Sequence, residues 1–138
     1  MSDEERRAYL GAGTRTAKLA VTRLSGAPHV APIWFVLDGD DVVFTTGADT
    51  VKGKALLRDG RVALCVDDEQ PPFSFVTIEG TTRIGTDVDE MLPWATRLGA
   101  RYMGAERAEQ FGRRNAVPGE LLVRVVPTRI VAKARISD

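Results

Sequence analysis

Short apolar segments of strand length, separated by turn signals, recur from residue 17 to the end of the chain. "TAKLAVTRL" alternates, with Ala17, Leu19 and Val21 on one side, as a half-buried strand does. "HVAPIWFVL" and "VVFTT" flank "DGDD", whose Asp-Gly pair is a strong hairpin signal. "RVALCV", "FSFVTIEGTTRI" and "LLVRVVPTRIVAKARI" follow, the last as two strands or one strand bent at Pro127. These segments predict about six mostly antiparallel strands.

Helices are predicted in three places around these strands. "SDEERRAYLG" can be capped by Ser2, with Glu5 completing a capping box. A second helix begins near Asp49 or Thr50, and residues 87–114 carry apolar residues at helical spacing and a second helical piece. The length suits one domain, residues 1–138, with its own core. We predict a mainly β (α+β) fold, a small antiparallel barrel with peripheral helices.

The charge balance excludes several classes of partner. Nineteen basic residues match nineteen acidic ones, so the sequence has no bulk signature of nucleic-acid or membrane binding, and we expect neither partner. The single cysteine, Cys65, lies in an apolar run and is expected to be a buried small side chain in a reducing environment. With no apolar run of transmembrane length and no leader-like start, a cytoplasmic location is predicted.

Few side chains in the sequence could perform catalysis or hold a metal. His29 is the only histidine, and no G-x-S-x-G elbow is present, so a nucleophilic triad is a poor hypothesis. One histidine and one cysteine, far apart, supply no metal-ligand cluster. We therefore predict no catalytic side chain and no metal; if the protein is an enzyme, a cofactor carries the chemistry.

The segment "HVAPIWFVL" is apolar on both faces. Ala31, Ile33 and Phe35 lie on one side and Val30 and Trp34 on the other, whereas a strand with one wet face would alternate. A helix, a second subunit or a flat ligand must therefore cover the second face. Pro32 interrupts the hydrogen-bond ladder, which indicates an edge or bulge where backbone groups are free.

The segment "FTTGADTVKGKALLR" gathers cations at a strand-to-helix junction. It is not a P-loop, because Gly47 and Gly53 have five residues between them and Ala55 replaces the hydroxyl residue. The helix start still favours an anion, and Lys52 and Lys54 would add charge. The alternative is that these lysines belong to a solvated helix face.

Residues 11–84 resemble a known family. The "PHVAPIWF" strand, the "FTTG" strand end, the "K-x-[KR]" helix and the "D-x-R-V" strand entry are similar to those of the pyridoxamine-phosphate-oxidase (PPOX) superfamily. The most similar subgroup is that of actinobacterial proteins thought to use the deazaflavin coenzyme F420. The resemblance implies a six-stranded antiparallel split β-barrel, as in FMN-binding split barrels, and a homodimer with the cofactor at the subunit interface.

The resemblance also implies the residues of the cofactor site. One group would lie along the deazaflavin ring: His29, Val30, Ala31 and Pro32. A second would form the loop beside the ribityl and phosphate region: Phe44, Thr45, Thr46, Gly47 and Ala48. Lys52 and Lys54 would meet the phosphate, and the partner subunit would contribute Phe73, Ser74 and Phe75.

Three functions follow from these expectations. The first is an F420-dependent oxidoreductase that transfers a hydride between the reduced deazaflavin and a small unsaturated or quinone-like substrate. The second uses FMN on the same scaffold. The third is a non-catalytic cofactor-binding or carrier protein, which the lack of an acid or base other than His29 favours; the scaffold holds haem in some members.

Overall fold

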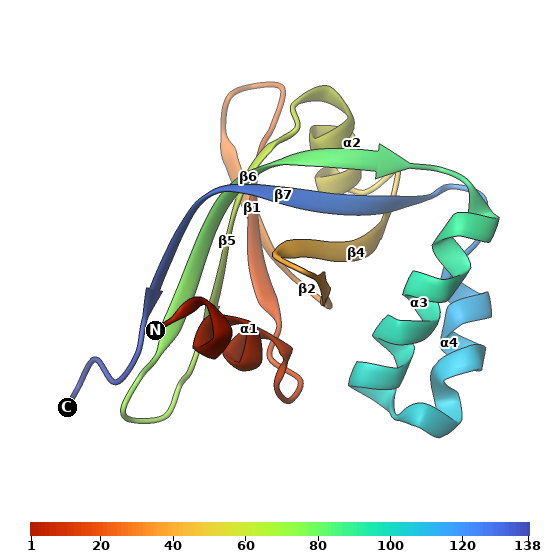
Figure 1. Ribbon diagram of the computed structural model, residues 1–138. Helices are drawn as coiled ribbons and strands as arrows, with labels where there is room; N and C mark the ends of the chain where they lie inside the picture. Colours follow the sequence, from red (N-terminus) through yellow and green to blue (C-terminus); the bar gives the residue numbers. More distant parts are fainter.

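Seven antiparallel strands form one open sheet in the computed structural model, which describes residues 1–138 (Figure 1). They are β1 (Ala17–Thr22), β2 (Pro28–Ile33), β3 (Val36–Asp38), β4 (Asp41–Gly47), β5 (Arg61–Asp67), β6 (Phe75–Gly85) and β7 (Glu120–Lys133). Their order in the sheet is β2-β1-β5-β6-β7-β4-β3. The mainly β antiparallel fold with helices is confirmed. The closed six-stranded barrel is wrong, because the sheet has a seventh strand and stays open.

The additional strand arises at Trp34 and Phe35, where "HVAPIWFVL" divides into β2 and β3. Two side chains of α3 (Val88–Met103) bind the Phe35 backbone at this point. The Phe35 N–H donates to Tyr102 Oη at 3.2 Å, and Arg101 Nη1 donates to the Phe35 carbonyl at 2.6 Å. These bonds replace ladder bonds, so the strand ends here. Because the partners lie 66 and 67 positions along the chain, the local pattern could not predict the break.

The two edges of the sheet are consecutive segments of the chain. Only Trp34 and Phe35 separate β2 from β3, so Ile33 and Val36 lie within roughly 11 Å of each other. The sheet must therefore curl until its edge strands, β2 and β3, come close to each other. No hydrogen-bond ladder joins them, so the sheet remains open. The curled sheet encloses the main core, to which Leu19, Phe44 and Val125 contribute fully buried side chains.

The predicted helix starts are confirmed. In α1 (Asp3–Gly11), Ser2 Oγ accepts a hydrogen bond from the Glu5 N–H at 3.1 Å. In α2 (Val51–Arg58), Thr50 Oγ1 accepts from the Gly53 N–H at 3.0 Å. Residues 87–115 contain α3, a short 3-10 helix (Ala105–Arg107) and α4 (Ala108–Asn115).

The helices cover two different parts of the sheet. α1 and α2 insert Leu10 and Leu56 into the core from opposite ends of the curled sheet (Figure 1). α3 packs on the outer face of β4, where Val43 contacts Leu98, and α4 lies beside α3.

β7 is one long bent strand, which decides between the two alternatives predicted for this segment. The β6–β7 register shifts between Glu79 and Gly80, and Gly80 lies opposite Pro127. A Cβ on Gly80 would lie 2.6 Å from the Val126 carbonyl oxygen, so only glycine allows the strands to approach at this irregularity.

The outer face of β2, β1, β5, β6 and β7 carries small and apolar side chains, and the charged residues Lys18, Asp67, Glu79 and Arg129 lie on the same face. Cross-strand partners share a face, so the pairings bring together one set, named here the open sheet face: Val30, Ala20, Ala63, Cys65, Thr77 and Val131. None of them is buried within the chain. Cys65 is half-buried, contrary to the expectation of a buried thiol.

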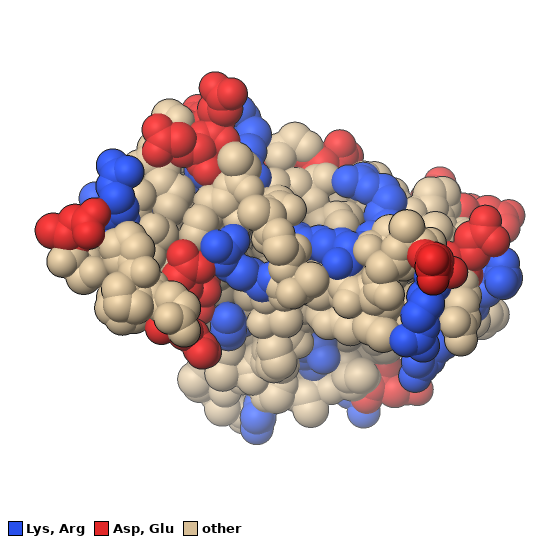
Figure 2. Space-filling view, turned by 90° about the horizontal axis from the view of Figure 1, so that it is seen from below, with Lys and Arg blue, Asp and Glu red and all other residues tan.

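The charged side chains form small mixed groups. Figure 2 shows basic and acidic atoms interspersed among uncharged ones on one side of the molecule, in accord with the balanced charge. No helix combines the length and hydropathy that a membrane crossing requires.

Candidate functional site

A cleft of about 220 Å³ lies where β2, β4 and α2 meet the α3–α4 pair. It is called here the Lys52 cleft, and these residues line it: Pro32, Ile33, Trp34, Thr45, Thr46, Lys52, Leu98, Asn115 and Glu120. Four of the residues expected at a cofactor site are among them: Pro32, Thr45, Thr46 and Lys52. The structure thus brings together the edge strand, the β4 end and one lysine of the basic helix.

The turn from β4 into α2 fixes the position of Lys52. Thr50 Oγ1 donates to the Gly47 carbonyl at 2.8 Å and accepts from the Gly53 N–H at 3.0 Å. A Cβ on Gly53 would lie only 2.1 Å from the Gly47 oxygen, so the backbones of helix and turn are in direct contact. The glycine between the two lysines therefore holds the helix against the strand end.

Lys54 lines a different cleft. Residues two apart on an α-helix point about 200° away from each other, so Lys52 and Lys54 face opposite sides of α2. A shallow cleft of about 350 Å³, called here the Lys54 cleft, is lined by Arg23, Leu24, Val51, Lys54, Ala55 and Arg58. None of the eleven ion pairs of the structure includes Lys52, Lys54 or Arg58.

Glu120, at the first position of β7, is a site residue that the sequence analysis did not predict. Its Oε2 is buried and has no hydrogen-bond partner. Burial raises the pKa of the Glu120 carboxyl above its ordinary value, and the Lys52 ammonium opposes the rise. One acidic residue at the start of a strand gives no sequence signal that distinguishes it from a solvated one.

The β2 residues divide between the two faces of the sheet. Val30 and Pro32 lie on the outer, exposed face, whereas His29 and Ala31 pair with the buried Val21 and Leu19 side of β1. His29 Nδ1 lies 3.0 Å from Arg23 Nη2. Since a guanidinium only donates, this nitrogen accepts the bond, and Arg23 connects His29 to the Lys54 cleft.

The other expected residues lie apart from the Lys52 cleft. Phe44 is fully buried in the core, and Ala48 holds the turn through its N–H, which donates to the Gly119 carbonyl at 2.8 Å. Phe73, Ser74 and Phe75 lie in and after the β5–β6 connection, where the Ser74 carbonyl accepts from Tyr9 Oη beside α1. One chain does not bring these three residues to Lys52, and their contribution across a dimer stays a prediction.

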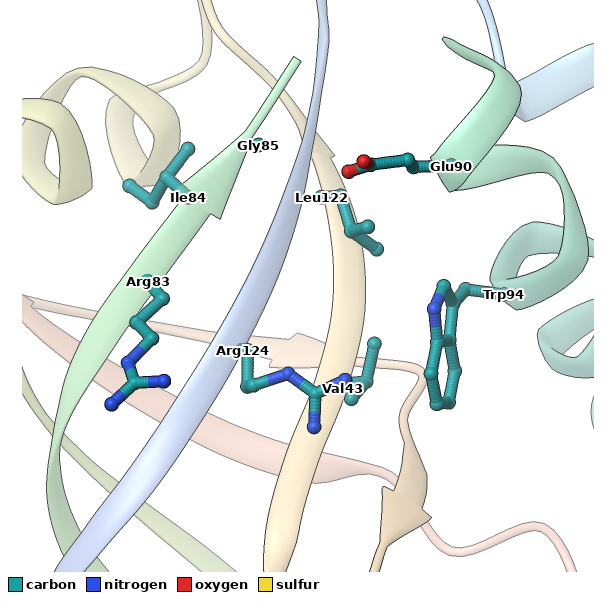
Figure 3. A pocket seen from close by; sticks show the side chains of 8 residues that line it. All are labelled: Val43, Arg83, Ile84, Gly85, Glu90, Trp94, Leu122 and Arg124. Atoms are coloured by element: carbon teal, nitrogen blue, oxygen red, sulfur yellow. The ribbon is translucent and has the colours of Figure 1, made fainter. Parts of the chain in front are cut away.

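A further cleft, of about 410 Å³, lies on the other side of α3 (Figure 3). Arg83 and Arg124 project into it from paired positions of β6 and β7, with Glu90 and Trp94 of α3 opposite. Arg124 is already bound by the carboxylates of Asp38 and Asp41, at 2.8 and 3.2 Å. This cleft contains none of the expected site residues.

Metal chemistry has no support in the arrangement of side chains. No group of three or more histidine, cysteine, aspartate or glutamate side chains is placed to hold an ion. The polar groups of the Lys52 cleft are instead an ammonium, a carboxylate, two hydroxyls and an amide. Such a mixture suits an organic ligand with several hydrogen-bonding groups.

Comparisons with known proteins agree with this fold. The family model described as pyridoxamine 5'-phosphate oxidase matches residues 2–133. A conserved hypothetical protein from Mycobacterium tuberculosis has a TM-score of 0.85 and 24% identity, over 99% of this chain and 87% of its own. An F420 reductase has a TM-score of 0.70 and 23% identity, over 90% and 94%. The haem storage protein HutZ from Vibrio cholerae has a TM-score of 0.72 and 16% identity, over 94% and 91%. No curated protein sequence matches the chain.

Proposed function

Because the chain belongs to the pyridoxamine 5'-phosphate oxidase family, we propose that it is an F420-dependent oxidoreductase. A bound reduced deazaflavin would supply a hydride and water a proton, so that a small unsaturated or quinone-like substrate gains two electrons and two protons. The chain's own residues bind and orient the cofactor. We assign no catalytic side chain.

The observation that carries the proposal is the composition of the Lys52 cleft. Pro32 interrupts the edge strand, Thr45 and Thr46 end β4, and Lys52 extends from a helix fixed by Gly53. These elements are far apart in the sequence and meet at one place. The Lys54 cleft adds Arg23 and Arg58, whose charges suit the phosphodiester and carboxylates of the coenzyme tail.

A homodimer completes the proposed site. The Lys52 cleft, at about 220 Å³, is smaller than the roughly 300–1,000 Å³ of ordinary ligand pockets. A second chain on the open sheet face would cover Val30 and could supply Phe73 to Phe75 to its partner's cofactor. In this arrangement the partner subunit covers the apolar outer side of β2, which is exposed in a single chain.

A fluorescence-quench titration with oxidised coenzyme F420, and with FMN in parallel, tests the proposal. We expect micromolar or tighter binding of the deazaflavin, weakened about 10- to 100-fold in Lys52→Ala, because a charged hydrogen-bond donor is lost. Arg113→Ala is the control, since Arg113 is an exposed cation on α4 whose only ion pair is with Glu109, one turn away. Absorption spectra separate the cofactors, because the oxidised deazaflavin absorbs at shorter wavelength than FMN.

Two results would change the assignment. Tight binding of FMN alone would make the protein an FMN-dependent oxidoreductase of the same fold. Deazaflavin binding with no turnover of any quinone or activated alkene by the reduced cofactor would indicate a carrier. If neither cofactor binds, the lysines of α2 belong to a solvated face and the proposal is wrong.

A further inference from the structure

We propose that the cleft between β6, β7 and α3, called here the Arg83 cleft, binds a small zwitterion with an apolar side chain: an amino acid or a short peptide. Arg83 binds the carboxylate of this ligand, and Glu90 binds its ammonium group. The cleft, of about 410 Å³, shares no lining residue with the Lys52 cleft. The inference therefore goes beyond the proposed function and does not depend on it.

The first observation is a pair of opposite charges that face one cleft without partners. Arg83 projects from β6, and the Glu90 carboxylate points from α3 toward the strands on the opposite side of the cleft (Figure 3). Neither side chain takes part in any of the eleven ion pairs of the structure, so the two do not neutralise each other. A ligand with a positive and a negative end carries the charges that both side chains lack.

Arg124 adds hydrogen-bond donors on the basic side of the cleft. Its Nη1 donates to the carboxylates of Asp38 and Asp41, at 2.8 and 3.2 Å, whereas its Nε and Nη2 make no hydrogen bond. Arg83 lies directly opposite Arg124 across β6 and β7, and like charges at such positions repel each other. The two aspartates neutralise Arg124, but Arg83 has no acidic partner. A ligand carboxylate beside both guanidiniums therefore relieves the repulsion.

Glu90 decides between a zwitterion and a simple anion. A ligand with negative charge alone would meet this carboxylate across the cleft, and like charges disfavour binding. A ligand with positive charge alone would meet the guanidiniums of Arg83 and Arg124. Only a ligand with both charges finds an opposite charge on each side.

The surface between the charged groups is apolar. Val43 is buried, and Leu122 and Trp94 are half-buried. The Arg124 guanidinium lies 5.3 Å from the centroid of the Trp94 ring and holds it in place. Such a surface gains free energy when it covers an aliphatic or aromatic side chain, so it selects a zwitterion with an apolar group.

Gly85 leaves the cleft open, although the chain does not require a glycine there. Its φ lies outside the left-handed region, and a Cβ at this position would have no atom within 4 Å. Gly53 differs, because there the backbone of the β4 turn leaves no room for a side chain. A larger residue at position 85 would occupy the space that the ligand needs.

Three ligands of nearly equal size test the proposal: L-leucine, 4-methylpentanoate, which lacks the ammonium group, and 3-methylbutylamine, which lacks the carboxylate. Isothermal titration calorimetry measures each one on the full chain at neutral pH. We expect a Kd of about 1 mM or tighter for L-leucine and at least about fivefold weaker binding of the other two, because each loses one charged contact on a partly exposed surface. Leucylglycine identifies the ligand class: tighter binding than that of L-leucine indicates a peptide, weaker binding a free amino acid, and both support the inference.

Two variants should act oppositely on the ligands with one charge. Arg83→Gln should weaken L-leucine and 4-methylpentanoate about five- to tenfold without weakening the amine. Glu90→Gln should weaken L-leucine and the amine but strengthen 4-methylpentanoate, because a like charge is removed. Arg113→Gln and Glu109→Gln, at exposed positions of α4, are the controls and should bind all three ligands as wild type does.

Two further measurements locate the ligand. Gly85→Leu fills the cleft, so the affinity for L-leucine should fall at least about tenfold while the Tm without ligand stays within a few degrees of wild type. In ¹H–¹⁵N spectra the indole N–H signal of Trp94, identified with Trp94→Phe, should shift during the titration, and that of Trp34 should not.

Several results would overturn the inference. They are no binding of L-leucine or leucylglycine at about 10 mM, equal affinity for L-leucine and 4-methylpentanoate, and wild-type affinities in both charge variants. A folded Gly85→Leu that binds L-leucine as wild type does, or an unshifted Trp94 signal, would also overturn it. If Gly85→Leu does not fold, the charge variants decide. None of these titrations contains a flavin, so their outcome is separate from that of the cofactor experiment.

Discussion

At the scale of single residues, Arg101 decides where a strand ends. Its guanidinium donates to the carbonyls of Phe35, Leu10 and Gly13, at 2.6, 2.7 and 3.0 Å, and lies 4.5 Å from the Phe35 ring centroid. Burial lowers the pKa of Arg101 from its ordinary value, which indicates how far it is withdrawn from water. One side chain of α3 thus connects the α1–β1 loop to the junction between β2 and β3.

Replacing Arg101 should destabilise the protein markedly. In Arg101→Leu the three carbonyls lose a charged donor, and we expect the free energy of unfolding to fall by about 2–4 kcal/mol. Arg97→Leu is the matched control, because Arg97 lies one turn earlier on α3, is exposed and donates to the Leu37 carbonyl. Its expected loss is below about 1 kcal/mol. Urea unfolding followed by tryptophan fluorescence measures both, and equal losses would contradict the role of Arg101.

Glu120 should make stability depend on pH in an unusual direction. Its folded-state pKa is raised, so the folded state binds the proton more tightly than the unfolded state does. Proton binding by Glu120 stabilises the folded state fully when the pH is below the ordinary carboxyl pKa of 4.5. This stabilisation is lost as the pH rises through the folded-state pKa. We expect the Tm of Glu120→Gln minus that of wild type to increase as the pH rises from about 4 to 8. A Tm difference that stays constant across this range would refute the prediction.

At the scale of elements, close backbone contacts determine how the helices sit. α2 lies on the β4 turn because Gly53 has no side chain, and α3 meets α4 because Gly99 and Gly112 have none. A Cβ on Gly112 would lie 2.2 Å from Thr96 Oγ1, and one on Gly99 would lie 2.8 Å from the Phe111 Cβ. Each helix that lines the Lys52 cleft is thus positioned by a glycine.

Gly53→Ala should displace α2. The added methyl cannot fit 2.1 Å from a backbone oxygen, so the helix must move, at an expected loss of about 1–3 kcal/mol in the free energy of unfolding. Gly11→Ala, in the last turn of α1, is the control, since nothing lies within 4 Å of the new Cβ. Thermal unfolding and cofactor titration check the prediction. Wild-type stability and affinity in Gly53→Ala would disprove the close contact.

The sequence alone predicted the features of the fold that depend only on neighbouring residues. Ser2 and Thr50 cap helices where predicted, and the Asp-Gly turn forms, because caps and turns depend on neighbouring residues. It failed at Phe35, whose partners on α3 lie far along the chain. For the site, Lys52 and Pro32 were both expected at a cofactor and line one cleft. Helix geometry turns Lys54 to another cleft, and Glu120 becomes distinctive only through burial.

At the scale of the whole molecule, the helices leave one side of the sheet open. α1 and α2 contribute to the core inside the curl and α3 and α4 cover β4, whereas the open sheet face has no buried side chain. Small residues such as Ala20 and Ala63 lie opposite each other on this face, where the proposed second copy would pack. Burial and neighbouring Asp67 raise the pKa of the Cys65 thiol on this face, which makes it a weak nucleophile.

Ala63→Arg should separate the proposed dimer. Ala63 is exposed within one chain, so the arginine leaves the monomer intact but places a long charged side chain in the interface, where it blocks the close approach of a second chain. Sedimentation equilibrium should show a dimer for wild type and for the control Ala100→Arg, which is also an exposed position but on α3, and a monomer for Ala63→Arg. Cofactor affinity should fall when dimerisation is lost. A monomeric wild type, or a dimeric Ala63→Arg, would exclude this interface.

The position of β7 has a consequence for folding during synthesis. β7 is made after the other six strands, yet it lies between β6 and β4 and is the only strand hydrogen-bonded to both. A nascent chain that ends before Glu120 therefore holds two separate pieces, β2-β1-β5-β6 and the β3–β4 hairpin, with no ladder between them. The Lys52 cleft, which draws on β2, β4 and β7, can form only after the C-terminal strand has left the ribosome.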